Sequence, residues 1–470
     1  MMSTQIPTSK KVNVVVIGGG GGGLCAAIAA AEAGAETVTL LEKLSYLGGD
    51  TLRSDQIISA GGTPLQAQAG IVDTPHAYMI DHIAGGRYKS DLVVAATLIQ
   101  HGAAAWDWLA NHGCSFPGPE ALHQQHDHTA KRSVKLQPPG MVPALKQTAL
   151  ALGVKILFET AATGLLTANG AVVGVQAEQA GQPVTFNADA VILATGGFGR
   201  NPQMVNESCY ALREAVSWNS PGNTGDGIRM AQELGAAVID YPDLPLRAFR
   251  VIQTGSDVRN KVLHPTYLMA QTRGLGAILV ATDGKRFYDE MGRSNEIVQA
   301  AIARGPVFYN IFDSRIATPS PWLPEKTFEE QWASAVNDGM VGAQADSLAD
   351  LAHAMGLPAA DLEQTIQRWN QDVTAGTDTE FGRATNLGTI EQPPFYAMRF
   401  KPAIVQTLGG LRINEETQVL TGDGQAIPGL YAVGQVTGGV HGADYIGGSS
   451  LLELVVFGKI AGENAVLLAA

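Results

Sequence analysis

The sequence contains little cysteine, and no two cysteines have the spacing of a metal or haem site. There are three cysteines among 470 residues, Cys25, Cys114 and Cys209, and they lie far apart. An odd, widely spaced set does not form a disulfide framework and is typical of a reducing compartment. Without a CxxC pair, the sequence also offers no zinc ribbon, and without CxxCH no covalent haem.

Positive charge and long apolar runs are also scarce. The formal net charge is −13, which argues against a nucleic-acid surface, although one local basic pocket for a small anion remains compatible with it. The apolar segment after Lys10 and Lys11 stops at glycine after six residues, with no cleavage site following, so it does not read as a signal peptide. No segment approaches about 18 uninterrupted apolar residues. We therefore expect a cytoplasmic protein without a membrane span.

The histidine-rich segment "HQQHDHT", with His123, His126 and His128, is the one candidate metal motif. Its flanks are polar, so a solvated loop explains it better than a metal site. We expect no metal centre.

What the chain does have is a six-glycine run between an apolar segment and an alanine-rich one. "VNVVVIG" predicts a buried parallel strand, "GLCAAIAAAEAG" a helix that Gly34 ends, and "ETVTLLEK" a second strand. Gly18, Gly20 and Gly23 fit GxGxxG: a tight turn, close approach of a pyrophosphate, and helix packing on the strand. We expect Gly19, Gly21 and Gly22 to be replaceable. Glu42 ends the second strand, where a carboxylate can bind ribose hydroxyls.

Two later segments favour FAD over NAD. "ADAVILATGGFGRNP" predicts a strand at 189–194 followed by a glycine turn, without a second complete fingerprint. Residues 427–465 predict a strand, a glycine-rich loop and a final helix that begins near "GGSSL". A helix N-terminus at that place would stabilise negative charge on a reduced flavin.

Together these motifs resemble the flavoprotein family of soluble fumarate reductases, succinate dehydrogenase flavoproteins, L-aspartate oxidase, urocanate reductase and 3-ketosteroid dehydrogenases. The resemblance spans nearly the whole chain and also includes "LLEKLSYLGGDT", "TGDGIRMAQELGA", "HPTYLMAQTRGLGAILVATDGKRFYDEMGRSNEI", "TLGGLRI" and "GLYAVGQVTGGVHGADYIGGSSL". It is closest to the soluble fumarate-reductase branch. It implies an α/β fold: a Rossmann-like FAD-binding domain formed by residues 1–262 and 405–470, with an inserted α+β substrate cap domain at 263–404.

The resemblance also implies a set of cofactor contacts. They are Gly18, Gly20, Gly23, Glu42, Lys43, Gly49, Thr51, Gly61, Gly62, Ala194, Thr195, Gly196, Asp226, Gly434, Gln435, Ser450 and Leu451. Gln435 stands where the family usually has glutamate, so it keeps a hydrogen bond and loses a charge. The histidine that carries covalent flavin in some members has no counterpart in "GGDTLRSDQIISAGG", so we expect non-covalent FAD.

Two residues match the family's catalytic positions. His264 in "HPT" corresponds to a substrate-binding histidine, with a loop-capping hinge histidine as the alternative. Arg293 in "DEMGRSNEI" corresponds to the proton-donating arginine, with a surface ion pair to Glu290 or Glu296 as the alternative. An arginine can act as an acid only when it is buried near other charges, because its free pKa exceeds about 12.

Three positions, 270, 406 and 445, depart from the family pattern. Ala270 replaces a glutamate that lies three residues before a second arginine of the proton path. Arg273 matches that arginine, so any relay must differ. Gln406 replaces a histidine, and Tyr445 replaces the arginine that clamps a substrate carboxylate. Tyr445 is either a hydrogen-bond donor to substrate or an aromatic wall. Leaving one buried carboxylate without its partner costs roughly 2–5 kcal/mol, so fumarate and succinate are poor candidates.

We therefore expect an FAD-dependent oxidoreductase, either an ene-reductase or a desaturase, that acts on the CH–CH bond of a small carbonyl or carboxylate compound. The alternatives are oxidation of a cyclic alcohol or amine, and a non-catalytic flavin redox sensor or carrier. Because the sequence has no haem motif, second dinucleotide fingerprint or iron–sulfur cysteines, the electron donor or acceptor is expected to be external.

Overall fold

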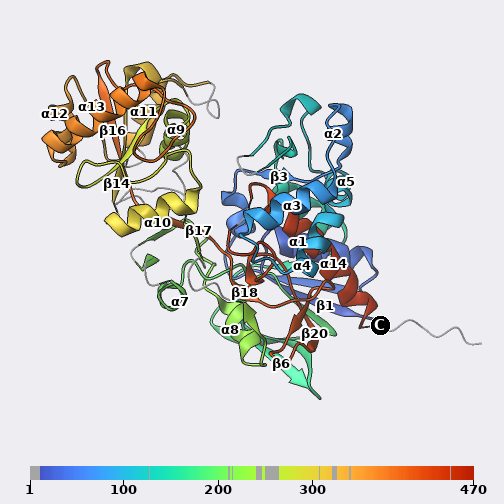
Figure 1. Ribbon diagram of the computed structural model, residues 1–470. Helices are drawn as coiled ribbons and strands as arrows, with labels where there is room; N and C mark the ends of the chain where they lie inside the picture. Colours follow the sequence, from blue (N-terminus) through green and yellow to red (C-terminus); the bar gives the residue numbers. More distant parts are fainter. Residues whose placement is uncertain are drawn as a thin grey trace, which may run out of the picture. The chain divides into compact units, whose positions relative to one another are not determined.

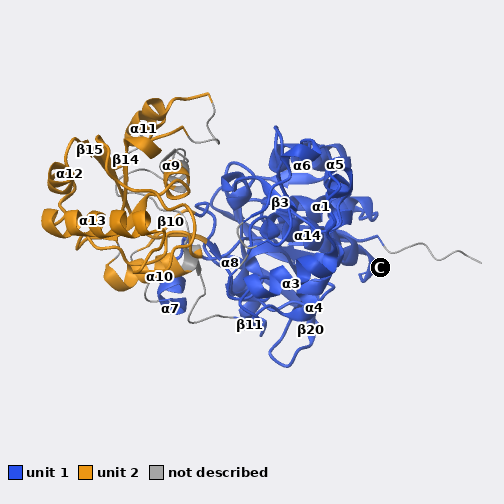
Figure 2. Cartoon of the chain, turned by 45° about the horizontal axis from the view of Figure 1, so that its top comes forward, with its two compact units in different colours: residues 1–209, 219–246, 406–470 blue, residues 210–218, 247–405 orange. Residues whose placement is uncertain are grey.

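The computed structural model describes residues 11–125, 128–209, 212–213, 215–239, 246–248, 264–305, 307–319, 325–337, 340–444 and 446–469. Of residues 246–248, 264–267, 270, 294 and 295 it describes only the backbone. The chain divides into two compact units (Figure 2). Unit 1 comprises residues 1–209, 219–246 and 406–470, and unit 2 comprises 210–218 and 247–405. The sequence places the start of the inserted domain at 263, whereas unit 2 already includes residues from 247. The role of this unit as a substrate cap stays a prediction.

Unit 1 is built on a six-stranded sheet with the strand order β19-β20-β9-β1-β2-β5. Figure 1 labels β1 and β20 of this sheet. The central strands β1 (Asn13–Ile17), β2 (Thr37–Leu41) and β9 (Ala190–Leu193) are parallel, with Val15 opposite both Thr39 and Val191. Strand β9 is buried at every position, as an apolar run in a covered parallel sheet requires. The expected strand, helix and strand at the start of the chain are thereby confirmed.

Two helices pack tightly beside this sheet. Helix α1 (Gly21–Glu32) follows β1, and α14 (Ser449–Leu467) is the closing helix expected from the sequence. A Cβ on Gly458 would lie 2.5 Å from Cys25 Cβ, and one on Gly462 would lie 2.3 Å from the Ala26 carbonyl oxygen. The two glycines therefore let the backbones of α1 and α14 approach closely, which places the first turn of α14 beside the glycine loop.

The remaining elements of unit 1 surround this centre. Its other strands are β3 (Ile57–Ser59), β4 (Ser133–Lys135), β5 (Lys155–Leu157), β6 (Thr160–Ala168), β7 (Ala171–Gln179), β8 (Gln182–Asn187), β11 (Val238–Ile239), β18 (Gly410–Leu411), β19 (Gln418–Leu420) and β20 (Ala426–Ala432). Its other helices are α2 (Pro64–Gln68), α3 (Pro75–Gly85), α4 (Leu92–Gln100), α5 (Gly102–Asn111), α6 (Met141–Ala151), α7 (Pro202–Ser208) and α8 (Asp226–Gln232), with the 3₁₀ turns η1 (Gly49–Arg53), η2 (Pro119–Ala121) and η5 (Gly434–Val436).

Unit 2 has its own antiparallel sheet, in the order β13-β14-β16-β15. Its strands are β13 (Ile278–Ala281), β14 (Phe308–Asp313), β15 (Gly342–Ala345) and β16 (Phe395–Phe400). Its helices are α9 (His264–Arg273), α10 (Ser294–Arg304), α11 (Phe328–Asn337), α12 (Leu348–Met355) and α13 (Ala359–Ala375), with the 3₁₀ turn η4 (Ser314–Ile316). Three further strands, β10 (Val216–Ser217), β12 (Leu246–Ala248) and β17 (Ala403–Thr407), lie where the chain passes from one unit to the other.

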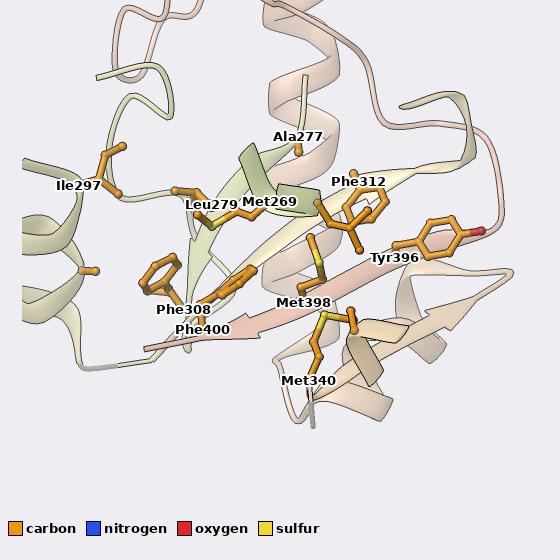
Figure 3. Packing of buried hydrophobic residues seen from close by; sticks show 14 of the residues in the cluster. Met269, Ala277, Leu279, Ile297, Phe308, Phe312, Met340, Tyr396, Met398 and Phe400 are labelled. Atoms are coloured by element: carbon orange, nitrogen blue, oxygen red, sulfur yellow. The ribbon is translucent and has the colours of Figure 1, made fainter. Parts of the chain in front are cut away.

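Both faces of the β13-β14-β16-β15 sheet are covered by buried side chains. Alternate residues of each strand point to opposite faces, so one strand contributes to both clusters. Phe308 and Phe312 join Met398 in one buried cluster, shown in Figure 3. Tyr309 and Ile311 point to the other face of the same strand. They belong to a second buried cluster that contains residues of α12 and α13. Unit 2 is therefore a three-layer α/β body with a core of its own. Within the described residues, no helix is long and apolar enough to cross a membrane.

Candidate cofactor and active site

The glycine loop after β1 contains two positions that admit no side chain. Gly18 has a φ of +107°, and a Cβ there would lie 2.3 Å from the Ala194 carbonyl oxygen. A Cβ on Gly23 would lie 1.9 Å from the Gly18 carbonyl oxygen. Both glycines are therefore needed by the fold itself, since α1 begins directly against the ends of β1 and β9.

Gly20 differs because the space beside it is open. The nearest atom to a Cβ at this position is the Gly48 carbonyl oxygen at 3.9 Å, and the φ of Gly20 is −75°. This open space lies at the N-terminus of α1, where backbone N–H groups and the helix dipole favour an anion. The geometry fits the pyrophosphate contact predicted for Gly20.

A side chain at Gly19 or Gly21 would require a neighbouring side chain to move, and the expectation that these glycines are replaceable stays a prediction. A Cβ on Gly19 would lie 2.3 Å from Leu47 Cδ2, and one on Gly21 would lie 2.9 Å from Thr51 Oγ1. Leu47 and Thr51 come from the segment after β2, which folds back over the loop, and the Gly21 N–H donates to Thr51 Oγ1 at 3.1 Å. Sequence spacing alone does not reveal this second layer.

Glu42 lies at the end of β2 with its carboxylate turned to the loop. Its Oε2 accepts from the Gly19 N–H at 2.9 Å, and its Oε1 accepts from the Leu44 N–H at 2.8 Å. Burial raises the pKa of this carboxyl, and the backbone hydrogen bonds oppose that rise. The next residue, Lys43, donates to Asp226 Oδ2 at 2.5 Å. Burial alone would raise the pKa of Asp226, but its hydrogen bond and charge interaction with Lys43 hold it below the usual value.

The turn after β9 completes another wall of this cradle. Gly196 has a φ of +74°, and its Cβ position lies 3.0 Å from Asn223 Nδ2. A Cβ on Gly227 would lie 2.3 Å from Thr195 Oγ1, which places Thr195 beside the start of α8 and Asp226. The Thr195 hydroxyl is buried and has no hydrogen-bond partner within the described part of the chain. Buried polar groups are normally satisfied, so this atom fits a site that holds a polar ligand.

The last wall comes from η5 and the first turns of α14. Leu454 Cδ2 lies 2.7 Å from the Cβ position of Gly434 and 3.3 Å from that of Gly22, so these three segments meet at one point. Ser450 and Leu451 lie in the first turn of α14. We assign the Gln435 amide nitrogen to Asp50 Oδ2, at 2.9 Å, and the amide oxygen to the Thr407 N–H, at 2.7 Å, because this orientation satisfies both partners.

Gly61 and Gly62 lie in a different environment from the other predicted cofactor residues. A Cβ on Gly61 would lie 2.7 Å from the Thr74 carbonyl oxygen, and one on Gly62 would lie 3.4 Å from Pro75 Cδ. Packing against the start of α3 therefore accounts for Gly61, and a φ of +74° accounts for Gly62. Their cofactor contact stays a prediction.

Two predicted catalytic side chains fall outside the described residues. Tyr445 is not described at all, and His264 begins α9 but its side chain is not described. Gln406 lies in β17, in unit 1. Arg293, in unit 2, occupies the position just before the first turn of α10.

Arg273, at the end of α9, is a buried guanidinium. Burial lowers its pKa to about 10, the charge of Glu290 opposes this change, and Arg383 adds to it. Arg383 also donates to the Arg273 carbonyl oxygen at 2.8 Å. Position 270, where the family has a glutamate, is alanine in this chain. Glu290 instead provides a negative charge that acts on Arg273.

Glu290 does not form the surface ion pair that was the alternative explanation for Arg293. It is fully buried and accepts from Arg286 Nη2 at 2.8 Å and from Arg383 Nη1 at 3.2 Å. Arg286 in turn donates to Asp378 at 2.9 Å. This buried charged cluster was not predicted, because no local pattern distinguishes its members from surface residues.

The "HQQHDHT" segment is also not a simple solvated loop. His128 is only 3% exposed, and its ring lies 5.8 Å from that of Tyr78. Its Nδ1 lies 3.3 Å from Ser133 Oγ. Within the described part of the chain, no group of histidine, cysteine and acidic side chains is arranged to hold a metal ion. His126 lies outside that part.

A buried His–Glu pair joins α14 to the loop that precedes it. His441 Nε2 lies 2.8 Å from Glu453 Oε2, and Thr437 Oγ1 donates to Glu453 Oε1 at 3.3 Å. Thr437 also donates to the Gly434 carbonyl oxygen at 2.8 Å. The pair therefore stabilises the η5 turn through Thr437.

The parallel sheet, the glycine loop and the converging walls define a dinucleotide-binding protein of the α/β class. A family model described as an FAD binding domain matches residues 13–451. The chain belongs to this flavoprotein family, which includes fumarate and urocanate reductases, and its cofactor is FAD.

Similar proteins cover nearly the whole chain. A urocanate reductase from Eggerthella lenta is 33% identical over 97% of this chain and 75% of the relative. A fumarate reductase (cytochrome) from Shewanella frigidimarina is 31% identical over 97% of this chain and 77% of the relative. The open conformation of a flavocytochrome c3 fumarate reductase superposes with a TM-score of 0.82 at 29% identity, covering 98% of this chain and 79% of that one. The chain is thus a fumarate-reductase-like FAD-dependent oxidoreductase.

Proposed function

We propose that this protein reduces or forms a C=C bond next to a single carboxylate or carbonyl group, and that fumarate and succinate are not its substrates. The observation that carries this proposal is a pair of differences from the family pattern, Gln406 in place of a histidine and Tyr445 in place of an arginine. Arg273 and Arg293 match the arginines of that pattern. The urocanate reductase relative supports it, because urocanate carries one carboxylate.

The proposed roles follow from the charge that the reaction develops. FAD supplies hydride acceptance or donation at the flavin. Addition of hydride to one carbon places negative charge on the activating carboxylate or carbonyl, which hydrogen-bond donors must stabilise. His264, Gln406 and the phenol of Tyr445 are proposed as these donors. Arg293 is proposed to give the proton to the neighbouring carbon.

The charge around Arg273 supports a proton path behind Arg293. A guanidinium in water does not release its proton near neutral pH. Burial lowers the pKa of Arg273 to about 10, which is the direction that proton release requires. Glu290, held by Arg286 and Arg383, keeps this region charged without exposing it to water.

The substituted positions set the proposed substrate class. A glutamine and a tyrosine donate hydrogen bonds but carry no positive charge, whereas arginine binds a carboxylate through a bidentate, charge-assisted fork. A second carboxylate on the substrate would be desolvated here without a cation. We propose that the electron donor or acceptor is a separate molecule or protein.

The test is reoxidation of the reduced enzyme. Photoreduced protein is mixed without oxygen with fumarate, urocanate, a substituted acrylate or a cyclic enone, and the return of oxidised-flavin absorbance is followed. We expect a monocarboxylate or an enone to reoxidise the flavin faster than fumarate. Arg293→Gln is expected to lower this rate by roughly 10²–10⁴-fold, the usual contribution of general acid catalysis.

The matched control is Arg304→Gln, at the other end of α10, where the side chain is 45% exposed. This variant is expected to keep the parent rate. Fumarate as the fastest oxidant, no reoxidation by any of the four compounds, or an unchanged rate in Arg293→Gln would each refute the proposal.

A further inference from the structure

Asp50 connects segments that are far apart in the sequence. It lies in η1, between the predicted cofactor residues Gly49 and Thr51. Its Oδ1 accepts from the Ser220 N–H. Its Oδ2 accepts from Asn219 Nδ2 at 2.7 Å and from Asn223 Nδ2 at 2.8 Å.

These partners are themselves buried and extend the connection. Asn219 is fully buried and Asn223 is 3% exposed. Asn223 Oδ1 accepts from the Gly199 N–H at 2.8 Å, which ties the turn after β9 to the same centre. Gln435 donates to Asp50 Oδ2 at 2.9 Å and accepts from the Thr407 N–H. One carboxylate thus joins η1, the 219–223 segment and the Gly434–Gln435 turn, and reaches the β9 turn through Asn223.

The chemistry of this centre requires an acceptor with more than one oxygen. Four donors converge on Asp50, and all four are neutral. An ionised carboxylate accepts at both oxygens, whereas an asparagine would offer one oxygen and turn an N–H₂ group toward the remaining donors. Burial raises the pKa of Asp50, while the hydrogen bonds from Ser220 and Asn219 and the positive charges of Arg53 and Arg200 favour the ionised form.

We propose that Asp50 is a cofactor-positioning residue, whose carboxylate fixes the relative positions of the FAD cradle walls formed by η1, the 219–223 segment and the Gly434–Gln435 turn. Its direct partner Gln435 must then be an amide. A glutamate at 435 would place two carboxylates at hydrogen-bond distance, and like charges so close oppose ionisation of both.

The geometry also predicts that exchanging the two side chains restores most of the centre. In Asp50→Asn/Gln435→Glu, the asparagine oxygen accepts from the Ser220 N–H and its N–H₂ donates to the new carboxylate. That carboxylate accepts from the Thr407 N–H and lies within reach of Asn223 Nδ2, which is 3.0 Å from the Gln435 amide. Asn219 loses its acceptor, and the single negative charge moves across one hydrogen bond.

The experiment is a double-mutant cycle read by FAD affinity. Apoprotein of the parent, Asp50→Asn, Gln435→Glu and the double variant is titrated with FAD, and melting is recorded with and without FAD. We expect each single variant to weaken FAD binding at least about tenfold and the double variant to bind FAD more tightly than the weaker single variant, because contacting residues are coupled. Asp107→Asn, on the exposed face of α5, controls for loss of one surface carboxylate and should leave affinity unchanged.

A purely structural role would give a different result. In the single variants it would lower the melting temperature equally in the apo and FAD-bound forms and leave FAD affinity within about threefold of the parent. That result would overturn the proposal. If Asp50→Asn does not fold, the double variant decides: recovery of folding and FAD binding supports the proposal, and failure of the double variant overturns it. A double variant that binds FAD no better than the weaker single variant also overturns it.

Discussion

At the scale of single residues, burial changes the acid–base behaviour of unit 1. His82, on α3, is 1% exposed and its Nε2 lies 2.8 Å from the Val440 carbonyl oxygen. Burial lowers its pKa to about 4, and the neighbouring rings of His441 and His128 act in the same direction. The folded protein therefore holds this imidazole neutral in a pH range where the unfolded chain protonates it.

We predict that this histidine makes the folded state acid-sensitive. Because the pKa is lower in the folded state, the unfolded state binds more protons between pH 6.5 and 4, and the free energy of unfolding falls as pH falls through that range. The full loss is about 3 kcal/mol. Urea unfolding from pH 7 to 4 should show a shallower slope for His82→Gln than for the parent. The exposed His76→Gln should keep the parent slope, and equal slopes for His82→Gln and the parent would contradict the assignment.

At the scale of elements, the glycine loop and α1 separate what the fold needs from what the cofactor needs. Gly23 has no room for a Cβ because the Gly18 carbonyl oxygen lies 1.9 Å from that position. Gly20 has room for one, with its nearest neighbour at 3.9 Å. These environments fit the separate roles that the motif predicts, helix packing for Gly23 and close approach of a pyrophosphate for Gly20.

We predict opposite effects for alanine at these two positions. Gly20→Ala should leave the melting temperature of the apoprotein nearly unchanged and weaken FAD binding at least about tenfold, or 1.4 kcal/mol, because the new methyl group occupies the pyrophosphate space. Gly23→Ala should lower the free energy of unfolding by about 1–3 kcal/mol or more, as overpacking does. Thermal melting and FAD titration of both variants provide the check. A Gly20→Ala protein that binds FAD like the parent would refute the predicted pyrophosphate contact.

At the scale of the whole molecule, the chain forms two units, and each buries charged side chains in its own core. In unit 1 the guanidinium of Arg132 pairs with Asp73 and Asp81. In unit 2 Glu290 accepts from Arg286 and Arg383. Removing one partner from such a cluster leaves an uncompensated buried charge. The guanidinium of Arg286 also stacks over Trp369, 4.4 Å from the ring centroid. A displaced Arg286 side chain would therefore disturb the core of unit 2.

We predict that Glu290→Gln destabilises unit 2 by about 3 kcal/mol without releasing FAD from unit 1. Calorimetry should show one transition moved to lower temperature, while flavin fluorescence reports release of FAD at the parent temperature. Glu363→Gln, at an exposed position of α13, is the matched control and should melt like the parent. FAD release that follows the lowered transition would show that the units unfold together and would contradict this prediction.

How far the sequence predicts the structure depends on the range of the interactions. The β1–α1–β2 unit, strand β9 and helix α14 follow from local hydrophobic patterns and glycine spacing, and all are confirmed. The burial of His128 and Glu290 was missed, because a charged or polar residue carries no local mark of its environment. The cofactor contact implied for Gly61 stays a prediction, although packing against α3 by itself requires a glycine there.

The sequence by itself determined that this protein binds a dinucleotide, because a strand, a glycine turn and a helix are encoded within some thirty consecutive residues and lead directly to a phosphate site. The closing segment and the lack of a second complete fingerprint favoured FAD. It also specified the residue types at Gln406 and Tyr445, on which the proposed substrate class depends. Only the tertiary structure decided that Asp50 gathers four neutral donors and that Glu290 lies between two buried arginines. These arrangements depend on which distant segments meet, and burial changes the energy of a charge only once they have met.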